Sequence, residues 1–219
     1  MDEYQTIIAT IALTMGTAWA SGINLYATLA MLGILGSTGN IALPEGLVVL
    51  QDPLVIMAAC TMYAVEFFAD KTPGIDTGWD TIHSFIRIPA GVILAAGAVG
   101  DVSPAFSIAA GILGGTVSAT SHMLKAGSRV LINTSPEPFS NWTASVTEDV
   151  AVVGGLWAAL HYPVTFLVLF VVFIFAGIWL LPKIWRGICL LIGKLKRFFS
   201  QDRSPDSNIQ PEIKEIGRQ

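Results

Sequence analysis

The chain has 219 residues, of which 53% are hydrophobic and only 13% are charged, and its formal net charge is −4. A soluble domain usually carries about 25% charged residues, so this composition excludes an ordinary soluble domain and indicates an integral membrane protein. The stretch Val164–Leu181 has no charged residue, and at about 1.5 Å per residue it crosses most of a ~30 Å hydrocarbon core.

Six apolar segments predict an all-α, polytopic membrane helical bundle. In chain order they cover residues 5–36, 53–69, 86–100, 104–132, 144–160 and 163–182. The first is too long for one simple span, and Ala20–Tyr26 interrupts it with Ser, Gly and Asn. We therefore expect it to break, to kink or to include a re-entrant piece. The fourth segment is also long, and we expect Ser118–Ser128 to interrupt it in the same way.

Several helix starts carry local signals. Asp52 and Ser103 each precede a proline, which is the pattern of an N-cap followed by proline at the first helical position. Ser145 and Glu148 have the spacing of a capping box, so a further helix is expected to begin near residue 145, and Glu148 is interpreted as part of a cap more readily than as a catalyst.

The C-terminal part of the chain differs from the rest in composition. We interpret residues 1–182 as the membrane domain and residues 183–200, which mix Lys and Arg with Trp and Phe, as a basic amphipathic helix beside the membrane. Residues 201–219 are polar and predict a disordered cytoplasmic tail.

The basic residues predict the orientation. If six spans place both termini in the cytoplasm, all 12 Lys and Arg fall on the inner side. The outer connections then carry Glu45, Asp52 and Asp101 and no basic residue. This is the positive-inside pattern of a multi-pass protein.

A short internal similarity suggests two halves, residues 1–100 and 101–182. Gly16–Ser21 (GTAWAS) resembles Gly115–Thr120 (GTVSAT), and two halves of three spans would have opposite orientations. Inverted repeats of this kind occur in secondary transporters, whose sites lie at broken helices. The alternative is that two membrane helices rich in Gly, Ala and Thr match by chance.

Charged residues are concentrated in the connection between the second and third segments. In a helix, Asp76, Asp80, His83 and Arg87 would lie on one face because they are spaced i, i+4, i+7 and i+11. Glu66 and Asp70 lie one helical turn apart just before them. This hairpin would present an acidic stripe with one His and one Arg.

The fourth segment carries a counterpart with the same spacing. Ser118, His122, Lys125 and Arg129 would also share one helix face, and this stripe is basic. If the two halves pack face to face, the acidic and basic stripes can pair.

Ionisable groups near a bilayer are costly and usually face a bundle interior or a wet cavity. We therefore expect the two stripes to line a polar cavity that opens to the cytoplasm. There His83 and His122 could titrate near neutral pH, Asp80 could carry a proton or bind a cation, and Lys125 and Arg129 could bind an anion or keep the acids ionised.

Two alternatives stay open for the stripes: a structural salt-bridge network, or a solvated surface that only orients the protein. Arg87 argues against the second, because it begins an apolar run. Asn24 is a lone polar residue in the interrupted first segment. It is a candidate ligand or a hydrogen-bonding contact between helices.

The sequence contains no phosphate-binding loop, no G-x-S-x-G and no H-E-x-x-H. The spacing of Asp76, Asp80 and His83 could in principle bind a divalent ion, but this pattern is loose and leaves a metal undecided. No cofactor is expected, and nothing supports nucleic-acid binding.

The leading functional prediction is a small transporter or channel for an ion or small solute, with proton coupling through the Asp and His groups. One alternative is a membrane enzyme or flippase acting on a phosphorylated lipid carrier. The other is a non-transporting scaffold. The sequence leaves the substrate, the direction of transport and the oligomeric state open, including a homo-oligomer.

The segments Val65–Gly91 and Ser121–Gly155 resemble an uncharacterised bacterial membrane family, domain of unknown function 4126. The resemblance covers roughly residues 10–165 and implies a bacterial inner membrane, without implying an activity.

Overall fold

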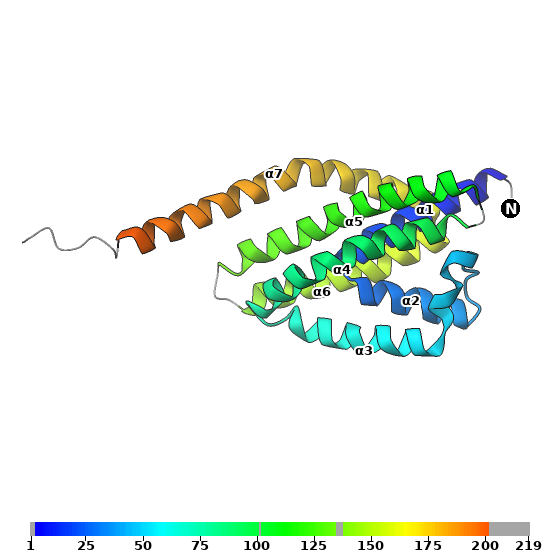
Figure 1. Cartoon of the computed structure of the whole chain (residues 1–219), viewed down its shortest axis with the longest axis horizontal. Helices are drawn as coiled ribbons and strands as arrows, with labels where there is room; N and C mark the ends of the chain where they lie inside the picture. Colours follow the sequence, from blue (N-terminus) through cyan, green and yellow to red (C-terminus); the bar gives the residue numbers. More distant parts are fainter. Residues whose placement is uncertain (1–2, 101, 135–137, 202–219) are drawn as a thin grey trace, which may run out of the picture.

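The computed structural model describes residues 3–100, 102–134 and 138–201, and within them it contains helices and no strand, as predicted (Figure 1). The helices are α1 (Glu3–Ile23), α2 (Leu25–Ser37), the 3-10 helix η1 (Glu45–Gln51), α3 (Pro53–Ala69), α4 (Ile75–Ala98), α5 (Pro104–Ile132), α6 (Pro138–His161) and α7 (Pro163–Gln201). The prediction of disorder for residues 201–219 falls, beyond Gln201, outside the described residues.

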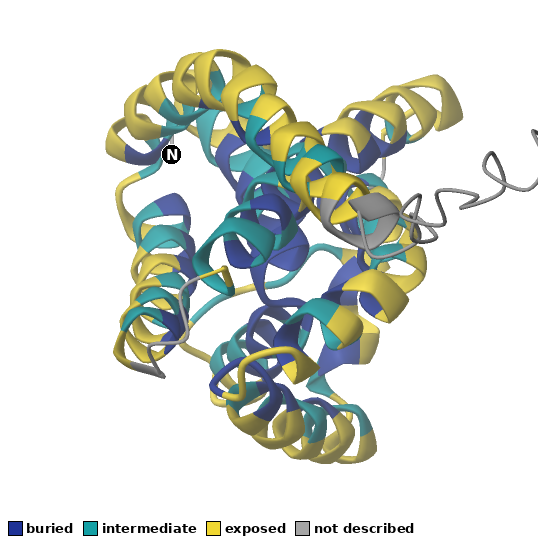
Figure 2. Cartoon of the chain, turned by 90° about the vertical axis from the view of Figure 1, so that its left-hand side faces the viewer, coloured by how far each residue is buried: buried dark blue, intermediate teal, exposed yellow. Residues whose placement is uncertain are grey.

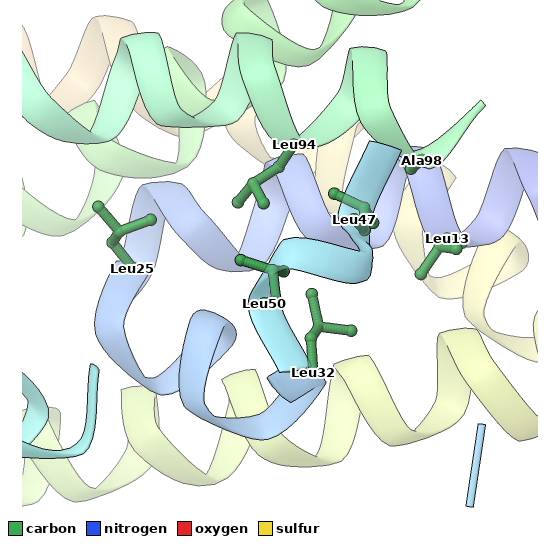
Figure 3. Packing of buried hydrophobic residues seen from close by; sticks show 7 residues of the cluster. All are labelled: Leu13, Leu25, Leu32, Leu47, Leu50, Leu94 and Ala98. Carbon is green, nitrogen blue, oxygen red and sulfur yellow. The ribbon is translucent and has the colours of Figure 1, made fainter. Parts of the chain in front are cut away.

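The long first segment folds back on itself instead of crossing the bundle. α1 ends at Ile23, and α2 returns toward the end of the bundle from which α1 came (Figures 1 and 3). Asn24 forms the bend in extended backbone conformation, and its side-chain oxygen accepts a hydrogen bond from the amide of Ala27 at 2.9 Å. The first segment is therefore broken at Asn24, which is one of the predicted outcomes. We refer to α1, Asn24 and α2 as the re-entrant hairpin; that it re-enters a membrane stays a prediction.

The expected matching break in the fourth segment is wrong, because α5 runs unbroken from Pro104 to Ile132. The polar residues of Ser118–Ser128 are satisfied without a break. Ser121 donates to the carbonyl oxygen of Val117 one turn back, and Ser118 donates to the carbonyl oxygen of Arg87 on α4.

The predicted helix starts have mixed outcomes. Asp52 caps α3 by accepting from the amide of Leu54 at 2.8 Å, as expected. Ser103 is the N-cap of α5 but makes no side-chain capping bond. The start predicted near Ser145 is wrong, because α6 begins at Pro138. Ser145 and Glu148 therefore lie inside the helix, where Glu148 cannot act as a cap.

α1 is the central helix of the bundle and packs against α4, α5, α6 and α7. α1 and α5 approach so closely at Gly22 that a Cβ atom there would overlap the carbonyl oxygen of Ser118. Toward the end of the bundle where α1 begins, α1, α2, η1 and α4 enclose an apolar core (Figure 3). It consists of Leu13, Leu25, Leu32, Leu47, Leu50, Leu94 and Ala98.

The outward faces of the helices are apolar. Buried residues lie along the inward faces, and exposed residues form the outer surface (Figure 2). Large hydrophobic side chains are exposed even on the helices that carry the charged stripes, among them Phe68, Ile82, Phe85 and Phe139. Exposed apolar surface of this extent is typical of contact with lipid or with other proteins.

Three described helices are long and apolar enough to cross a membrane, and the bent pair of η1 and α3 raises the number to four. The three are α1, α4 and the part of α7 from Pro163 to Arg197. The six spans expected from the sequence are therefore not all recognised by length and hydropathy. α5 and α6 are long as well, with 29 and 24 residues, but they do not combine length with sufficient hydropathy in the same way.

The re-entrant hairpin changes the predicted placement of the termini. Glu3 lies at the end of the bundle that also holds the α4–α5 and α6–α7 connections, whereas α7 runs toward the opposite end (Figure 1). Glu3 and the end of α7 thus lie at opposite ends of the bundle, and the side of a membrane on which each terminus lies stays a prediction.

A buried ion-pair network as the candidate functional site

The charged stripes meet inside the bundle, at the end where α3 joins α4. Asp76, Asp80, His83 and Arg87 are all buried on one face of α4, which confirms that they share a face. Their burial shows that the solvated-surface alternative is wrong for these residues. On α5, the predicted stripe of Ser118, His122, Lys125 and Arg129 is buried as well.

Arg87 joins the acidic residues of two helices. Its guanidinium donates from one Nη atom to Glu66 Oε1 on α3 at 2.5 Å and from the other to Asp80 Oδ1 at 2.9 Å. Arg87 and Glu66 are 0% exposed. A guanidinium suits this position because its planar fork presents several donors in fixed directions.

Lys125 lies at the centre of the network. Its Nζ donates to Asp70 Oδ2 at 2.6 Å, to Glu66 Oε1 at 3.4 Å and to the carbonyl oxygen of Ile23 at 3.0 Å. The carboxylates of Asp80 and Glu148 each lie 3.7 Å away. The ammonium group therefore ties the acids of α3 and α4 to the end of α1.

Arg129 connects the network to α6. It donates to Glu148 Oε2 at 2.7 Å and to Asn141 Oδ1 at 2.6 Å, and also to the carbonyl oxygen of Asp70 at 3.1 Å. Its Nη atoms are thus held by α6 and by the C-terminal end of α3. The expected pairing of the acidic and basic stripes is present in this geometry.

His122 is held as a neutral ring by its partners. The Arg87 guanidinium can only donate, so His122 Nδ1, at 3.3 Å, accepts, and His122 Nε2 carries the proton that it donates to Ser84 Oγ at 2.6 Å. A charged His122 would oppose Arg87 directly. This arrangement works against the expectation that His122 titrates near neutral pH.

His83 is held by Trp79 and Tyr26. The carbonyl oxygen of Trp79 can only accept, so His83 Nδ1 donates to it at 2.9 Å. Its Nε2 lies 3.1 Å from the hydroxyl of Tyr26 on α2, which can donate to a neutral ring or accept from a protonated one. The ring also stacks on Trp79 with centroids 4.2 Å apart.

Asp76 belongs to a separate, local arrangement. Its carboxylate accepts from the amides of Gly74 and Thr77 and from the side chain of Asn133 at the end of α5. An acid accepting amides in the first turn of a helix is stabilised by those bonds and by the helix dipole. Asp76 therefore fastens the start of α4 to the end of α5.

Asn24 reaches the edge of the network from the re-entrant bend. Its Nδ2 donates to Asp149 Oδ1 on α6 at 3.0 Å. Lys71, in the connection after α3, lies 3.9 Å from Asp149 Oδ2 and 3.0 Å from the ring centre of Phe67. Burial lowers the pKa of Lys71, and the neighbouring carboxylate of Asp149 opposes that shift.

Sequence reasoning missed the contribution of α6. Asn141, Ser145 and Glu148 are spaced i, i+4 and i+7, the same pattern that identified the other two stripes. Asn141 and Ser145 are buried and contact Arg129 and Lys71, respectively. This spacing could have predicted a third polar face, but the helix was expected to begin near residue 145, which left Asn141 outside it.

Two cavities lie elsewhere and are apolar. One of about 770 Å³ is lined by the first half of α1, the α4–α5 connection and the start of α5, including Ile7, Thr10 and Phe106. The other, of about 300 Å³, lies between α6 and α7 beside Trp19. Neither is lined by a residue of the ion-pair network.

A metal site is not preformed in this region. Within the described part of the chain, no group of three or more His, Cys, Asp or Glu side chains has an arrangement that could hold a metal ion. The acids that might have served as ligands are engaged with Arg87, Lys125 and Arg129.

Comparison with known proteins agrees with the resemblance of the two charged stretches. No curated protein and no solved structure matches the chain significantly. The family model described as domain of unknown function (DUF4126) matches residues 11–183, which include both stripes, the re-entrant bend and the α6 residues that complete the network. The chain therefore belongs to the DUF4126 family.

Proposed function

We propose that this protein is a small transporter or channel of the bacterial inner membrane for an ion or small solute, coupled to protons through its buried acids. One observation carries the proposal: the bend of a re-entrant hairpin meets a buried ion-pair network inside a bundle with an apolar exterior. Charged residues placed inside a membrane bundle are costly and commonly mark ion or proton pathways.

The re-entrant bend supports the same conclusion. Non-helical backbone at membrane depth is tolerated where protein buries it, and broken helices form ion sites in transporters. Here the carbonyl oxygen of Ile23 and the side chain of Asn24 face Lys125 and Asp149. A helix end thus contributes directly to the charged site.

In the proposed orientation the network lies toward the cytoplasm, as does the C-terminal end of α7. Lys71, Arg129 and the basic residues after Pro182 then lie on the inner side, in agreement with the positive-inside rule. The N-terminus would lie outside, together with Gly39 and the α4–α5 connection.

The inverted repeat stays a prediction. Its two similar stretches lie on α1 and α5, which pack together, and Ser121 just after the second stretch donates to the carbonyl oxygen of Trp19 in the first. However, α1 ends in a bend at Asn24, whereas α5 continues to Ile132.

The geometry gives less support to an enzyme or flippase for phosphorylated lipids. Such a site needs free basic groups beside an opening toward lipid, but Arg87, Lys125 and Arg129 are paired with acids. The cavity of about 770 Å³ is lined by none of them. A scaffold would need no buried charge, and flux measurements separate it from a transporter.

The test is a flux assay in liposomes containing the purified full chain, with protons, Na⁺, K⁺, phosphate and small charged solutes as separate probes. We expect the wild type to dissipate a gradient of at least one probe. Asp80→Asn should lose most of this flux, whereas Glu45→Gln, the same change at an exposed acid of η1, should retain it. Wild-type flux equal to that of protein-free liposomes for every probe would contradict the proposal and favour the scaffold.

A further inference from the structure

The ion-pair network contains one more acid than it has bases. Following the ion pairs from residue to residue, the connected bases within the described chain are Arg87, Lys125 and Arg129. The connected acids are Glu66, Asp70, Asp80 and Glu148. If all seven are ionised, the network carries one uncompensated negative charge.

The surplus charge is deeply buried. The side chains of Glu66 and Asp80 are 0% and 1% exposed, and only Glu148, at 18%, is partly open. A buried charge without a counter-charge is strongly destabilising, and a protein usually neutralises it by binding a proton or another ion. The surplus therefore calls for one additional positive charge.

Buried carboxylate oxygens without a hydrogen-bond partner show where that charge would bind. Among the described residues, Glu66 Oε2, Asp80 Oδ2 and Asp70 Oδ1 are buried and have no partner. The other oxygen of each group contacts Arg87 or Lys125. Each carboxylate thus has one oxygen held inside the network and one left available.

The groups around the network do not supply the missing charge. Lys71 pairs with Asp149 outside the network, and Asp76 is bound by amides and by Asn133. His122 is held as a neutral ring by Arg87, and His83, whose ring nitrogens contact Trp79 and Tyr26, forms no ion pair with an acid of the network among the described residues. The C-terminal end of α1 adds further negative potential through the carbonyl oxygen of Ile23.

We propose that the network binds one monovalent cation, a proton or an alkali-metal ion, at the unpartnered oxygens of Glu66, Asp70 and Asp80. Binding of this cation follows from the charge and burial of the network alone. The statement that it is the transported or coupling ion of the site rests on the proposed function.

A single positive charge fits better than a divalent ion. A divalent ion would leave the network with a net charge of +1. A proton needs only one of the unpartnered oxygens. An alkali-metal ion would balance the charge equally, but the described residues contain no preformed set of ligands for a metal ion, which favours the proton.

The experiment compares thermal stability of the full-length protein in detergent for wild type, Asp80→Asn and Glu66→Gln. Each substitution removes one acid and balances the network at three acids and three bases. In one arm Na⁺ or K⁺ replaces choline at constant ionic strength; in the other, pH rises from mildly acidic to mildly alkaline at fixed salt. A ligand that binds only the folded state raises the melting temperature with its concentration.

If an alkali-metal ion is bound, the wild-type melting temperature rises with Na⁺ or K⁺. If a proton is bound, the folded state holds one proton more than the unfolded state, so stability falls as pH rises. Either dependence should be absent in Asp80→Asn and Glu66→Gln and unchanged in Glu45→Gln. A wild type that responds to neither arm, or variants that respond as the wild type does, would overturn the proposal.

The wild-type measurement tests whether the network binds a cation even if a variant fails to fold. Because it records equilibrium binding without flux, its outcome is independent of the liposome assay. Cation binding without flux would identify a structural cation, and flux without cation linkage would mean that the transported species binds elsewhere.

Discussion

The ammonium group of Lys125 on α5 lies 3.0 Å from the carbonyl oxygen of Ile23, the last residue of α1. The last carbonyl groups of a helix have no partner within it, and the bend at Asn24 leaves this one inside the protein. Lys125 satisfies it and at the same time contacts the carboxylates of Glu66 and Asp70. The re-entrant hairpin and the ion-pair network therefore depend on the same side chain.

Replacing Lys125 with methionine should strongly destabilise the protein. The change removes the central cation, leaves Asp70 Oδ2 and the Ile23 carbonyl oxygen without their donor, and leaves Glu66 with Arg87 alone. Breaking a buried ion pair in this way costs about 3–5 kcal/mol. Melting temperature in detergent would reveal the loss. Lys183→Met, which removes an exposed lysine on α7, should change it little. Equal effects of the two changes would mean that the network contributes nothing to stability.

Arg87 and Glu66 should show strong energetic coupling. Arg87→Gln leaves two buried acids short of a cation, whereas Glu66→Gln removes the surplus acid, so the first should be destabilising and the second should be tolerated. In the double variant the loss should be smaller than the sum of the two single effects, by about 0.5–3 kcal/mol. A thermal double-mutant cycle measures this coupling. Additive effects would contradict the direct contact.

Asn24→Ala should loosen the re-entrant bend. It removes the cap on the Ala27 amide, which costs about 0.5–2 kcal/mol, and also the bond to Asp149. Asn24→Ser tests the first part alone, because serine can still cap α2 but is too short to replace the amide contact. We expect stability to decrease from wild type to Ser to Ala. An alanine variant as stable as wild type would argue against the bend as described.

Gly22→Ala should disturb the contact between α1 and α5. A Cβ atom there would overlap the backbone of Ser118, and overpacking of this kind typically costs 1–3 kcal/mol. Gly154→Ala is the matched control, because that glycine lies within α6 and a Cβ atom would meet nothing within 4 Å. The control should be neutral or more stable, by up to about 1 kcal/mol, because alanine favours helix.

Labelling from one side of the membrane tests the placement of the N-terminus. In a background without Cys60 and Cys189, single cysteines would replace Glu3, Asn40 and Thr72, which are all exposed. We expect an impermeant thiol reagent added outside intact cells to label the first two positions and not the third. Labelling of the cysteine at position 40 without labelling of the cysteine at position 3 would instead indicate that the first segment crosses the membrane.

The sequence by itself determined the class of the protein and the residues of its charged site. Apolar segments predicted helices, and the i, i+4, i+7 and i+11 spacing placed Asp80 with Arg87 and His122 with Lys125 on single faces, because helical geometry is local. The same spacing on α6 would have revealed Asn141 and Glu148 if the helix start had been placed correctly.

Only the tertiary structure decided how these faces are used. The return of α2 at Asn24, the unbroken course of α5 and the contact of Lys125 with Ile23 depend on packing between segments far apart in the chain. Local sequence gave the same signals of small and polar residues at Ala20–Tyr26 and Ser118–Ser128. The chain bends at Asn24 because Lys125 and Asp149 satisfy the polar groups that the bend exposes. α5 stays unbroken because the hydroxyl groups of Ser118 and Ser121 donate to backbone carbonyl oxygens.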